Sequence, residues 1–235
     1  MEDHILYLIP SPLSDNCRLC LLPEDIELVK RLDYFVVENA KTARKHLKIL
    51  GMEKSLRDLE MMVLDKNTIL DKITFANFLH QGGRIGMMSE AGCPAIADPG
   101  AWLVRLAHEM NFQVVPLVGP SSILLALMGS GANGQRFVFR GYLPIDHHER
   151  ELSIKEMLHR IKDFNETQLF IETPYRNQSL FEFLIEHLPD NVMMTLAINL
   201  TDYELENIQS RSIQDWKKVK LFPNISRQPC VFVLG

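Results

Sequence analysis

The sequence of 235 residues lacks any long hydrophobic run. Its most apolar stretches, such as SSILLALMG at 121–129, are well short of the ~18 residues that a membrane-spanning helix needs. Its first residues, MEDHILYLIP, put acidic residues ahead of a short apolar run, whereas a secretory signal begins with basic ones. We therefore expect a cytoplasmic protein with no membrane partner.

Positive charge is not in excess either. The formal net charge is −5 at pH 7, which argues against general nucleic-acid binding because affinity for phosphates needs concentrated Lys and Arg. One local concentration exists, because Lys41, Arg44, Lys45 and Lys48 are spaced so that they share one helix face. This face is a candidate surface for an RNA backbone or an acidic substrate; the alternative is a solvated helix face.

Cysteine is scarce, with four residues in the chain. Cys17 and Cys20 form a C-x-x-C, but no second close pair of Cys or His ligands accompanies them, as a structural zinc site would require. The adjacent His147 and His148 also have no matching ligands near them in the sequence. We therefore predict reduced, partly buried thiols, no metal site, and no role for the two histidines.

Short apolar, β-branched runs alternate with helical patterns in the first half of the chain. The predicted strands cover 5–10, 34–38, 84–89 and 113–118, and the predicted helices cover 24–32, 40–50, 71–81 and 101–110. This alternation is typical of a mostly parallel sheet with helices on both faces. We assign it to an N-terminal α/β domain, residues 1–117.

In the second half, more strands follow one another without helices between them. The predicted strands cover 136–144, 167–172, 193–199, 204–213 and 229–235, and the predicted helices cover 121–129, 149–164 and 176–188. This pattern predicts a mixed sheet in a C-terminal α/β domain, residues 118–235. Residues 129–134 spell G-x-G-x-x-G, but they follow a helix and precede a strand, the reverse of the dinucleotide-binding order, so we interpret them as a helix exit.

Three loops that lead from a predicted strand to a predicted helix carry residues suited to ligand contact. The loop at 88–100 combines glycines such as Gly92 with two prolines, which permit close main-chain approach and stiffen the path. Ser121 and Ser122 offer hydroxyl groups at a helix start. Glu172 and Arg176 stand at a strand end and a helix start, suited to substrate contact. The alternatives are a rigid connection, a helix cap and a surface salt bridge.

The order and spacing of these loops resemble the S-adenosylmethionine-dependent tetrapyrrole methylase superfamily, and most closely its branch of small-subunit ribosomal RNA ribose 2′-O-methyltransferases. The stretches that carry the resemblance are LYLIPSPL (6–13), VVENAKTARKHL (36–47), GRIGMMSEAGCPAIADPGAWLVRLA (83–107), VVPLVGPSSILLALMGSG (114–131), RFVFRGYLP (136–144) and LFIETPYR (169–176). The resemblance implies a homodimer with a two-domain α/β fold and S-adenosyl-L-methionine in the cleft between the domains.

By position, the resemblance also implies the residues of the site. The cofactor would be bound by Pro10, Gly92, Cys93, Ala95, Ile96, Ser121, Ser122, Ile171, Pro229 and Cys230. Lys41, Arg44 and Arg176 would contact the substrate, with Arg176 and Lys41 touching phosphate. Glu172 would draw the proton from the attacking ribose hydroxyl or orient that hydroxyl.

The substrate side departs from the branch more than the cofactor side does. The branch carries Asp-Thr-Arg where this chain has Asn39-Ala40-Lys41, and Ser-Pro-His-Arg where it has Thr173-Pro174-Tyr175-Arg176; a later Lys-Gly-Glu is absent. We predict methylation of small ribosomal subunit RNA at the ribose 2′-O of a cytidine. Two alternatives stay open: a tetrapyrrole or another small-molecule acceptor, and a cofactor-binding relative that no longer catalyses.

Overall fold

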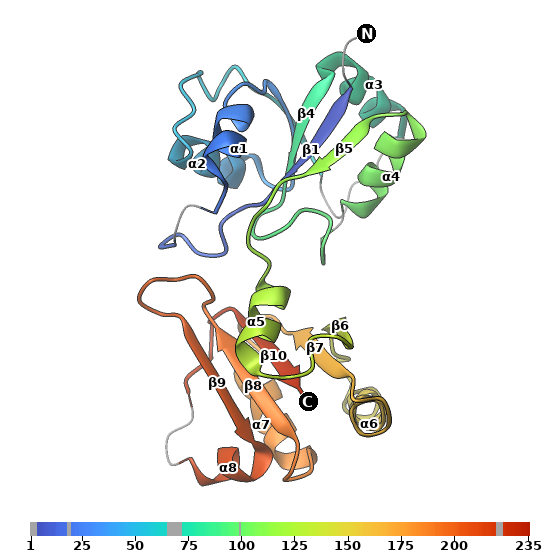
Figure 1. Ribbon diagram of the computed structural model, residues 1–235, viewed down its shortest axis with the longest axis vertical. Helices are drawn as coiled ribbons and strands as arrows, with labels where there is room; N and C mark the ends of the chain where they lie inside the picture. Colours follow the sequence, from blue (N-terminus) through green and yellow to red (C-terminus); the bar gives the residue numbers. More distant parts are fainter. Residues whose placement is uncertain (1–3, 18–19, 65–71, 99, 220–222) are drawn as a thin grey trace. The chain divides into compact units, whose positions relative to one another are not determined.

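The chain forms two compact units, Met1–Ser121 and Ser122–Gly235, each built on its own five-stranded sheet (Figure 1). The computed structural model describes residues 4–17, 20–64, 72–98, 100–219 and 223–235. Both units combine helices and strands, which confirms the predicted α/β fold class. Within the described ranges, no helix is long and apolar enough to cross a membrane.

The first unit has a fully parallel sheet with the strand order β3-β2-β4-β1-β5. Its strands are β1 (Ile5–Ile9), β2 (Tyr34–Val37), β3 (Glu60–Val63), β4 (Arg84–Met88) and β5 (Gln113–Pro116), and its helices are α1 (Pro23–Val29), α2 (Ala40–Ile49), α3 (Lys72–Gly82) and α4 (Ala101–Glu109). Because parallel strands need crossover connections, the helices must lie on the faces of the sheet.

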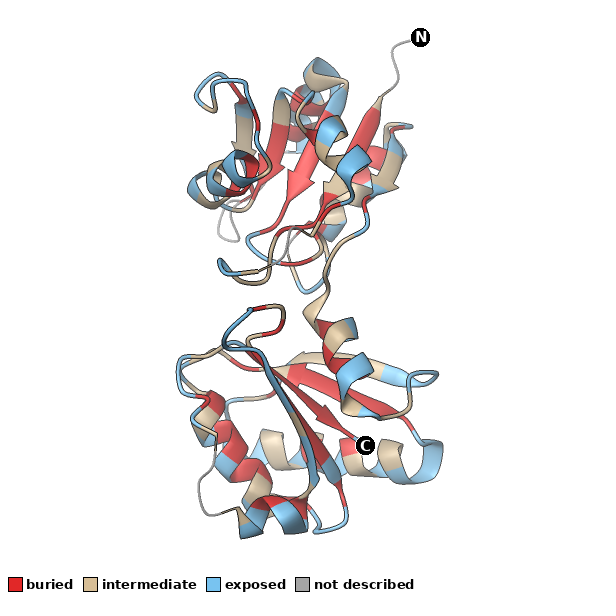
Figure 2. Ribbon diagram, turned by 60° about the vertical axis from the view of Figure 1, so that its left-hand side comes forward, coloured by how far each residue is buried: buried red, intermediate tan, exposed pale blue. Residues whose placement is uncertain are grey.

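Alternate side chains of the central strands enter two separate cores, one on each face of this sheet. Tyr7 and Ile9 of β1 pack with residues of α1 and α2, whereas Leu6 packs with residues of α3 and α4. The central strands are therefore apolar on both faces, and Figure 2 shows them as the most buried part of the unit. The expectation of a parallel sheet with helices on both faces is confirmed.

The second unit has a mixed sheet with the order β6-β7-β10-β8-β9, in which only the β6–β7 pair is parallel. Its strands are β6 (Phe137–Tyr142), β7 (Thr167–Ile171), β8 (Met193–Ile198), β9 (Asn207–Ser212) and β10 (Cys230–Leu234), and its helices are α5 (Ser122–Ser130), α6 (His147–Phe164), α7 (Asn177–His187) and α8 (Ile213–Lys218). The predicted mixed sheet is thus confirmed.

The core of the second unit lies between one face of its sheet and α6, α7 and α8. Phe170 of β7 and Phe232 of β10 stack with their ring centroids 5.4 Å apart, and both belong to this core. The buried Trp216 of α8 packs edge-on against Phe181 of α7 and donates a hydrogen bond from Nε1 to the Met194 carbonyl. Helix α5 contacts β8, β9 and β10.

Two elements differ from the sequence expectations. Strand β3 occupies the edge of the first sheet and is only partly buried, so it lacks a clear alternating pattern. Helix α8 has six residues, too few for a helical period to be visible. It follows β9 directly and begins at Ile213, the last residue of the strand that we expected at 204–213. The segment 129–134 does form a helix exit, with Gly131 at a φ of +73°.

A two-point ion pair at the end of α6 makes the stability of the second unit pH-dependent. Arg160 donates from Nε and Nη2 to both carboxylate oxygens of Glu166, at 2.9 and 2.7 Å. The hydrogen bonds from Arg160, and a further one from Gln168, lower the pKa of Glu166 from 4.5 to about 2. Because the folded-state pKa is depressed, the stabilisation is complete above the unfolded-state value and is lost as the pH falls from about 4.5 towards 2.

Urea unfolding of the wild-type chain and Glu166→Gln across this range checks the effect. We expect the wild type to be the more stable near neutral pH and the difference to vanish as the pH approaches 2. Glu109→Gln, which removes the exposed partner of Lys72, serves as the control. A difference between the wild type and Glu166→Gln that does not change with pH would refute the assignment.

Candidate functional site

The carboxyl edge of the first sheet brings together the predicted cofactor loops of that unit. Three segments leave the sheet at this edge: Pro10–Leu13 after β1, Ser89–Ile96 after β4, and Leu117–Ser121 after β5. Strands β4, β1 and β5 are neighbours in the sheet, so their loops must also be neighbours. In open parallel sheets this edge is where ligands bind. We call these three segments the edge loops.

The first two edge loops are joined by a short antiparallel bridge. The Ser11 amide donates to the Gly92 carbonyl at 2.9 Å, and the Gly92 amide donates to the Ser11 carbonyl at 3.0 Å. The fully buried Ser11 hydroxyl also donates to the Ser89 carbonyl at 2.8 Å. Gly92 adopts a φ of +75°, which glycine tolerates and other residues rarely do. The sequence therefore needs glycine at this bridge.

The third edge loop contacts both of the other edge loops. A Cβ atom added at Gly119 would lie 2.3 Å from Cβ of Pro10, so the two loops touch with no room for a side chain. The Cys93 thiol donates to the Pro120 carbonyl at 3.3 Å, and burial raises the pKa of this thiol. Cys93 thus stays protonated and acts as a structural contact rather than as a nucleophile. Ser121 ends this loop and Ser122 begins α5, so they fall on either side of the boundary between the units.

The backbone of the β4 edge loop and of the residue that follows it, Ala97, is strained. Ala95 and Ala97 have φ values of +65° and +61°, a conformation that costs a non-glycine residue about 1–2 kcal/mol. Between them, the Ile96 side chain is 53% exposed although it is apolar. Strain and exposed apolar surface both concentrate where proteins contact ligands. The positions of Gly92, Cys93, Ala95 and Ile96 in one strained loop agree with a binding role.

Glu38 is a polar residue at this edge that was not among the predicted site residues. It directly follows β2, and its Oε2 accepts a hydrogen bond from the Glu90 amide at 2.9 Å. Its Oε1 is buried without a hydrogen-bond partner among the described residues. Glu38 could have been identified from the sequence as an acidic residue at the end of a predicted parallel strand, because that position faces the ligand-binding edge.

In the second unit, strand pairing brings the remaining predicted cofactor residues together. Ile171 at the end of β7 pairs with Val231 of β10, so it lies beside Cys230 and Pro229. The Asn199 amide donates to the Pro229 carbonyl at 3.0 Å. Burial raises the pKa of Cys230, so this thiol also stays protonated. That these residues and the edge loops serve one cofactor stays a prediction.

Glu172 and Arg176 form the ion pair that the sequence left as one alternative. Arg176 Nη2 lies 2.6 Å from Oε1 of Glu172, and the Thr173 amide donates to the same oxygen at 2.5 Å. The Glu172 side chain is almost fully buried, whereas that of Arg176 is 37% exposed. The pair places a partly exposed guanidinium beside a buried carboxylate, an arrangement suited to an anionic substrate group. The catalytic role of Glu172 stays a prediction.

The basic helix face is partly used by internal contacts. Arg44 Nε donates to the Leu56 carbonyl at 3.2 Å, and Lys45 pairs with Asp15 at 2.5 Å. Lys41 and Lys48 are exposed, and neither forms an ion pair with another described residue. Asn39, which stands where the family branch has Asp, caps α2 by accepting from the Lys41 and Thr42 amides. Lys41 is the second residue of α2, which begins shortly after the carboxyl end of β2, whereas Arg44 is held by the Leu56 carbonyl.

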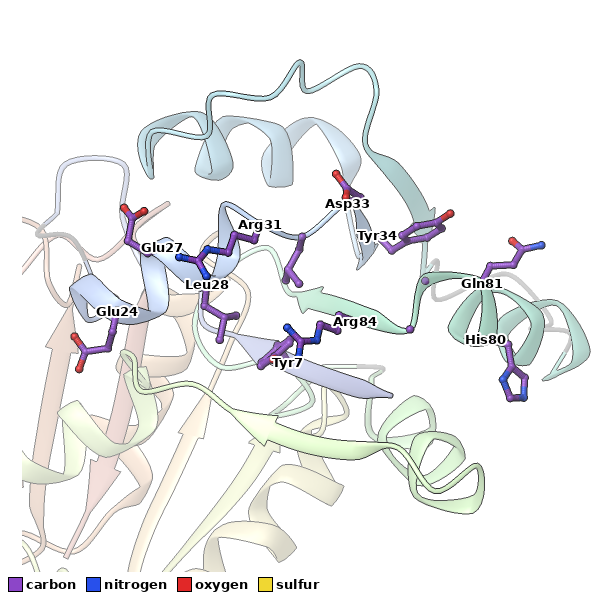
Figure 3. A pocket seen from close by; sticks show the side chains of 13 residues that line it. Tyr7, Glu24, Glu27, Leu28, Arg31, Asp33, Tyr34, His80, Gln81 and Arg84 are labelled. Atoms are coloured by element: carbon purple, nitrogen blue, oxygen red, sulfur yellow. The ribbon is translucent and has the colours of Figure 1, made fainter. Parts of the chain in front are cut away.

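A hollow of about 880 Å³ lies elsewhere in the first unit, around the amino ends of β2 and β4 (Figure 3). Its lining mixes charges of both signs, including Glu24, Glu27, Arg31 and Arg84. Ligands of open parallel sheets bind at the opposite edge, and none of the predicted site residues lines this hollow. We therefore place the candidate site at the edge loops.

Curated proteins named ribosomal RNA small subunit methyltransferase I are similar to this chain. The Buchnera aphidicola protein is 27% identical over 197 residues, which are 84% of this chain and 66% of that protein. The Haemophilus influenzae protein is 28% identical over 231 residues, 98% of this chain and 78% of that protein. The Bacillus subtilis protein is 31% identical over 186 residues, which are 79% of this chain and 60% of that protein. The chain thus spans 66% of the length of the Buchnera relative. No protein-family model matches the chain.

Solved structures confirm the fold. Cobalt precorrin-4 methyltransferase CbiF aligns with a TM-score of 0.59 and 13% identity over 99% of this chain and 95% of that one. The methyltransferase CobJ aligns with a TM-score of 0.59 and 16% identity over 98% and 92%. At these identities the likeness establishes the fold alone. The resemblance predicted from the sequence is thus confirmed: the chain has the fold of the tetrapyrrole methylases, and its sequence is similar to the ribosomal RNA small subunit methyltransferase I proteins.

Proposed function

We propose that this protein is an S-adenosylmethionine-dependent methyltransferase that acts on small-subunit ribosomal RNA, at the ribose 2′-O of a cytidine. The observation that carries the proposal is the sequence similarity to proteins named for that RNA, which extends over 98% of this chain for the Haemophilus protein. A second observation supports the proposal: the chain shares its fold with methyltransferases that act on other substrates. The resemblance also predicts a homodimer. This property and the cytoplasmic location expected from the sequence both stay predictions.

The edge loops fit a cofactor that is bound largely by main-chain groups. Gly92 and Gly119 have no side chains to obstruct a ligand, and a side chain at Gly119 would strike Pro10. The exposed Ile96 supplies an apolar contact of the kind that a purine ring needs. We propose that Pro10, the β4 edge loop and Ser121 bind S-adenosylmethionine in the first unit.

The reaction requires the protein mainly to position the methyl donor and the acceptor. When bound, S-adenosylmethionine supplies a methyl group that its sulfonium has already activated for displacement. The edge loops hold the donor in place and exclude water, which lowers the entropic part of the barrier. Arg176 and Lys41 each bind a phosphate of the acceptor. Glu172 holds Arg176 in position and takes the proton of the acceptor hydroxyl.

A small-molecule acceptor is the second candidate, and one observation favours it. Two of the four cations on the basic helix face, Arg44 and Lys45, are occupied by internal contacts. Together with the net charge of −5, this leaves less positive surface for a long RNA than the sequence suggested. A tetrapyrrole or another anionic small molecule needs only the Arg176 and Lys41 cations.

Calorimetric titration with S-adenosylmethionine and S-adenosylhomocysteine tests the cofactor. We expect micromolar binding of both ligands, a typical affinity for an enzyme site. Incubation with labelled donor and either immature small ribosomal subunits or a tetrapyrrole mixture then identifies the acceptor. Label in RNA supports the main proposal and label in pigment supports the second. Absence of binding to the folded chain would refute both.

A further inference from the structure

Two histidines and a glutamate, none of them assigned a role above, converge where the start of α6 meets the end of α7. His147 begins α6, Glu151 lies one turn later on the same helix, and His187 ends α7. One ligand atom from each residue lies within 4.8 Å of the others. We predicted no role for His147 from the sequence, because its partner His187 is 40 positions away and only the fold brings the two helices together.

The spacing of the three ligand atoms is close to that of a metal site. His147 Nδ1 lies 3.4 Å from Glu151 Oε1, and His187 Nε2 lies 3.8 Å from the same oxygen. Tetrahedral zinc with bonds of about 2.0–2.1 Å holds its ligand atoms roughly 3.3–3.4 Å apart. The first distance matches this value, and the second needs a small movement of side chains that are partly exposed.

A hydrogen bond also prepares His187 to bind a metal. Its Nδ1 lies 2.8 Å from the Phe183 carbonyl oxygen. Because a carbonyl has no proton to give, Nδ1 must be the donor, and the neutral ring then carries its lone pair on Nε2, which faces Glu151. Metal-binding histidines characteristically donate their second ring N–H in this way, which fixes the tautomer and the ring orientation.

Packing holds both imidazoles in place. The His187 ring stacks on the Phe183 ring with a centroid distance of 4.0 Å, and the His147 ring meets Phe183 edge-on at 5.1 Å. The neighbouring cation Arg150 is bound to the Pro144 and Ile145 carbonyl oxygens, at 2.8 and 3.0 Å. His187 ends its helix, where the dipole favours a cation.

We infer that His147, Glu151 and His187 form a zinc site that joins the start of α6 to the end of α7. Two imidazole nitrogens and one carboxylate oxygen are a typical three-ligand set for Zn²⁺, with water in the fourth position. The metal would connect two helices of one core and stabilise the folded second unit. This inference is independent of the proposed methyl transfer.

Zinc titration of the tag-free, chelator-treated full chain, in competition with a chromogenic zinc chelator, tests the inference. We expect one tight equivalent for the wild type. We expect His187→Gln and Glu151→Gln each to lower the affinity by at least about 100-fold, since even changes to outer-shell partners cost 10–100-fold. The matched control is His159→Asn, because His159 also pairs with a carboxylate one turn later, Asp163 at 2.7 Å, but no second histidine joins this pair among the described residues. This control should keep the wild-type affinity.

Thermal unfolding separates metal binding from damage to the fold. Without zinc, Glu151→Gln and the wild type should unfold at the same temperature, and added zinc should raise the midpoint of the wild type alone. Zinc that binds His187→Gln as tightly as the wild type would overturn the inference, as would equal losses in His159→Asn. Wild-type protein that loses the chelator competition would also overturn it, since the chain's eight histidines can hold zinc weakly without a site.

Discussion

Gly119→Ala is expected to lower the affinity for S-adenosylmethionine by about 10- to 100-fold. The added Cβ would lie 2.3 and 2.5 Å from Cβ and Cγ of Pro10, much closer than carbon atoms can approach. Because the proline ring cannot rotate away, the backbone of one edge loop must move. The movement shifts Pro10 or Ser121, and an affinity loss of tenfold corresponds to about 1.4 kcal/mol. Overpacking also costs about 1–3 kcal/mol of stability.

Calorimetric titration of folded Gly119→Ala, below its unfolding temperature, measures this effect. Gly134→Ala is the matched control, because a Cβ there meets no atom within 4 Å and the residue is not in the left-handed region. The control should bind the cofactor as the wild type does. Unchanged cofactor affinity in folded Gly119→Ala would show that the edge loops are not the binding site.

Sequence patterns were sufficient for the parts of the fold in which burial repeats regularly. The central strands of the first unit are buried on both faces, so they read as continuous apolar runs that can be recognised without a structure. Edge strand β3 has no such signal, because its residues are exposed or only half-buried. Helix α8 is shorter than two helical turns, so periodicity cannot identify it.

The candidate site was predictable where it depends on glycine and proline, which constrain the backbone locally. Gly92 is needed for its positive φ, and this requirement can be inferred from the residue type and its place in a loop. Contacts between distant segments were not predictable. Arg44 donates a hydrogen bond to the Leu56 carbonyl, and His147 lies close to His187. Both contacts depend on tertiary packing, which no local sequence pattern encodes.

Glu172→Gln is expected to lower turnover by about 10²- to 10⁴-fold, the range for loss of a general base, and to leave the affinity for S-adenosylmethionine unchanged. The substitution keeps the shape of the side chain, so its amide oxygen can still accept from the Thr173 amide. It removes the negative charge that faces Arg176 at 2.6 Å. A partly exposed arginine recovers some hydration, so we expect a stability loss of only about 1–2 kcal/mol.

Comparison with Arg176→Lys separates a proton acceptor from a group that only positions Arg176. If Glu172 takes the proton, Glu172→Gln lowers kcat with little change in KM for the RNA, whereas Arg176→Lys chiefly raises KM. If Glu172 only holds the guanidinium, both variants raise KM to a similar extent. Glu156→Gln is the control, because its partner Arg140 lies in a separate ion pair of the same unit.

Full turnover in Glu172→Gln would exclude both roles, and the acceptor proton would then have to leave through water or another side chain. In that case Glu38, whose buried Oε1 faces no described partner at the edge of the first sheet, becomes the next residue to test.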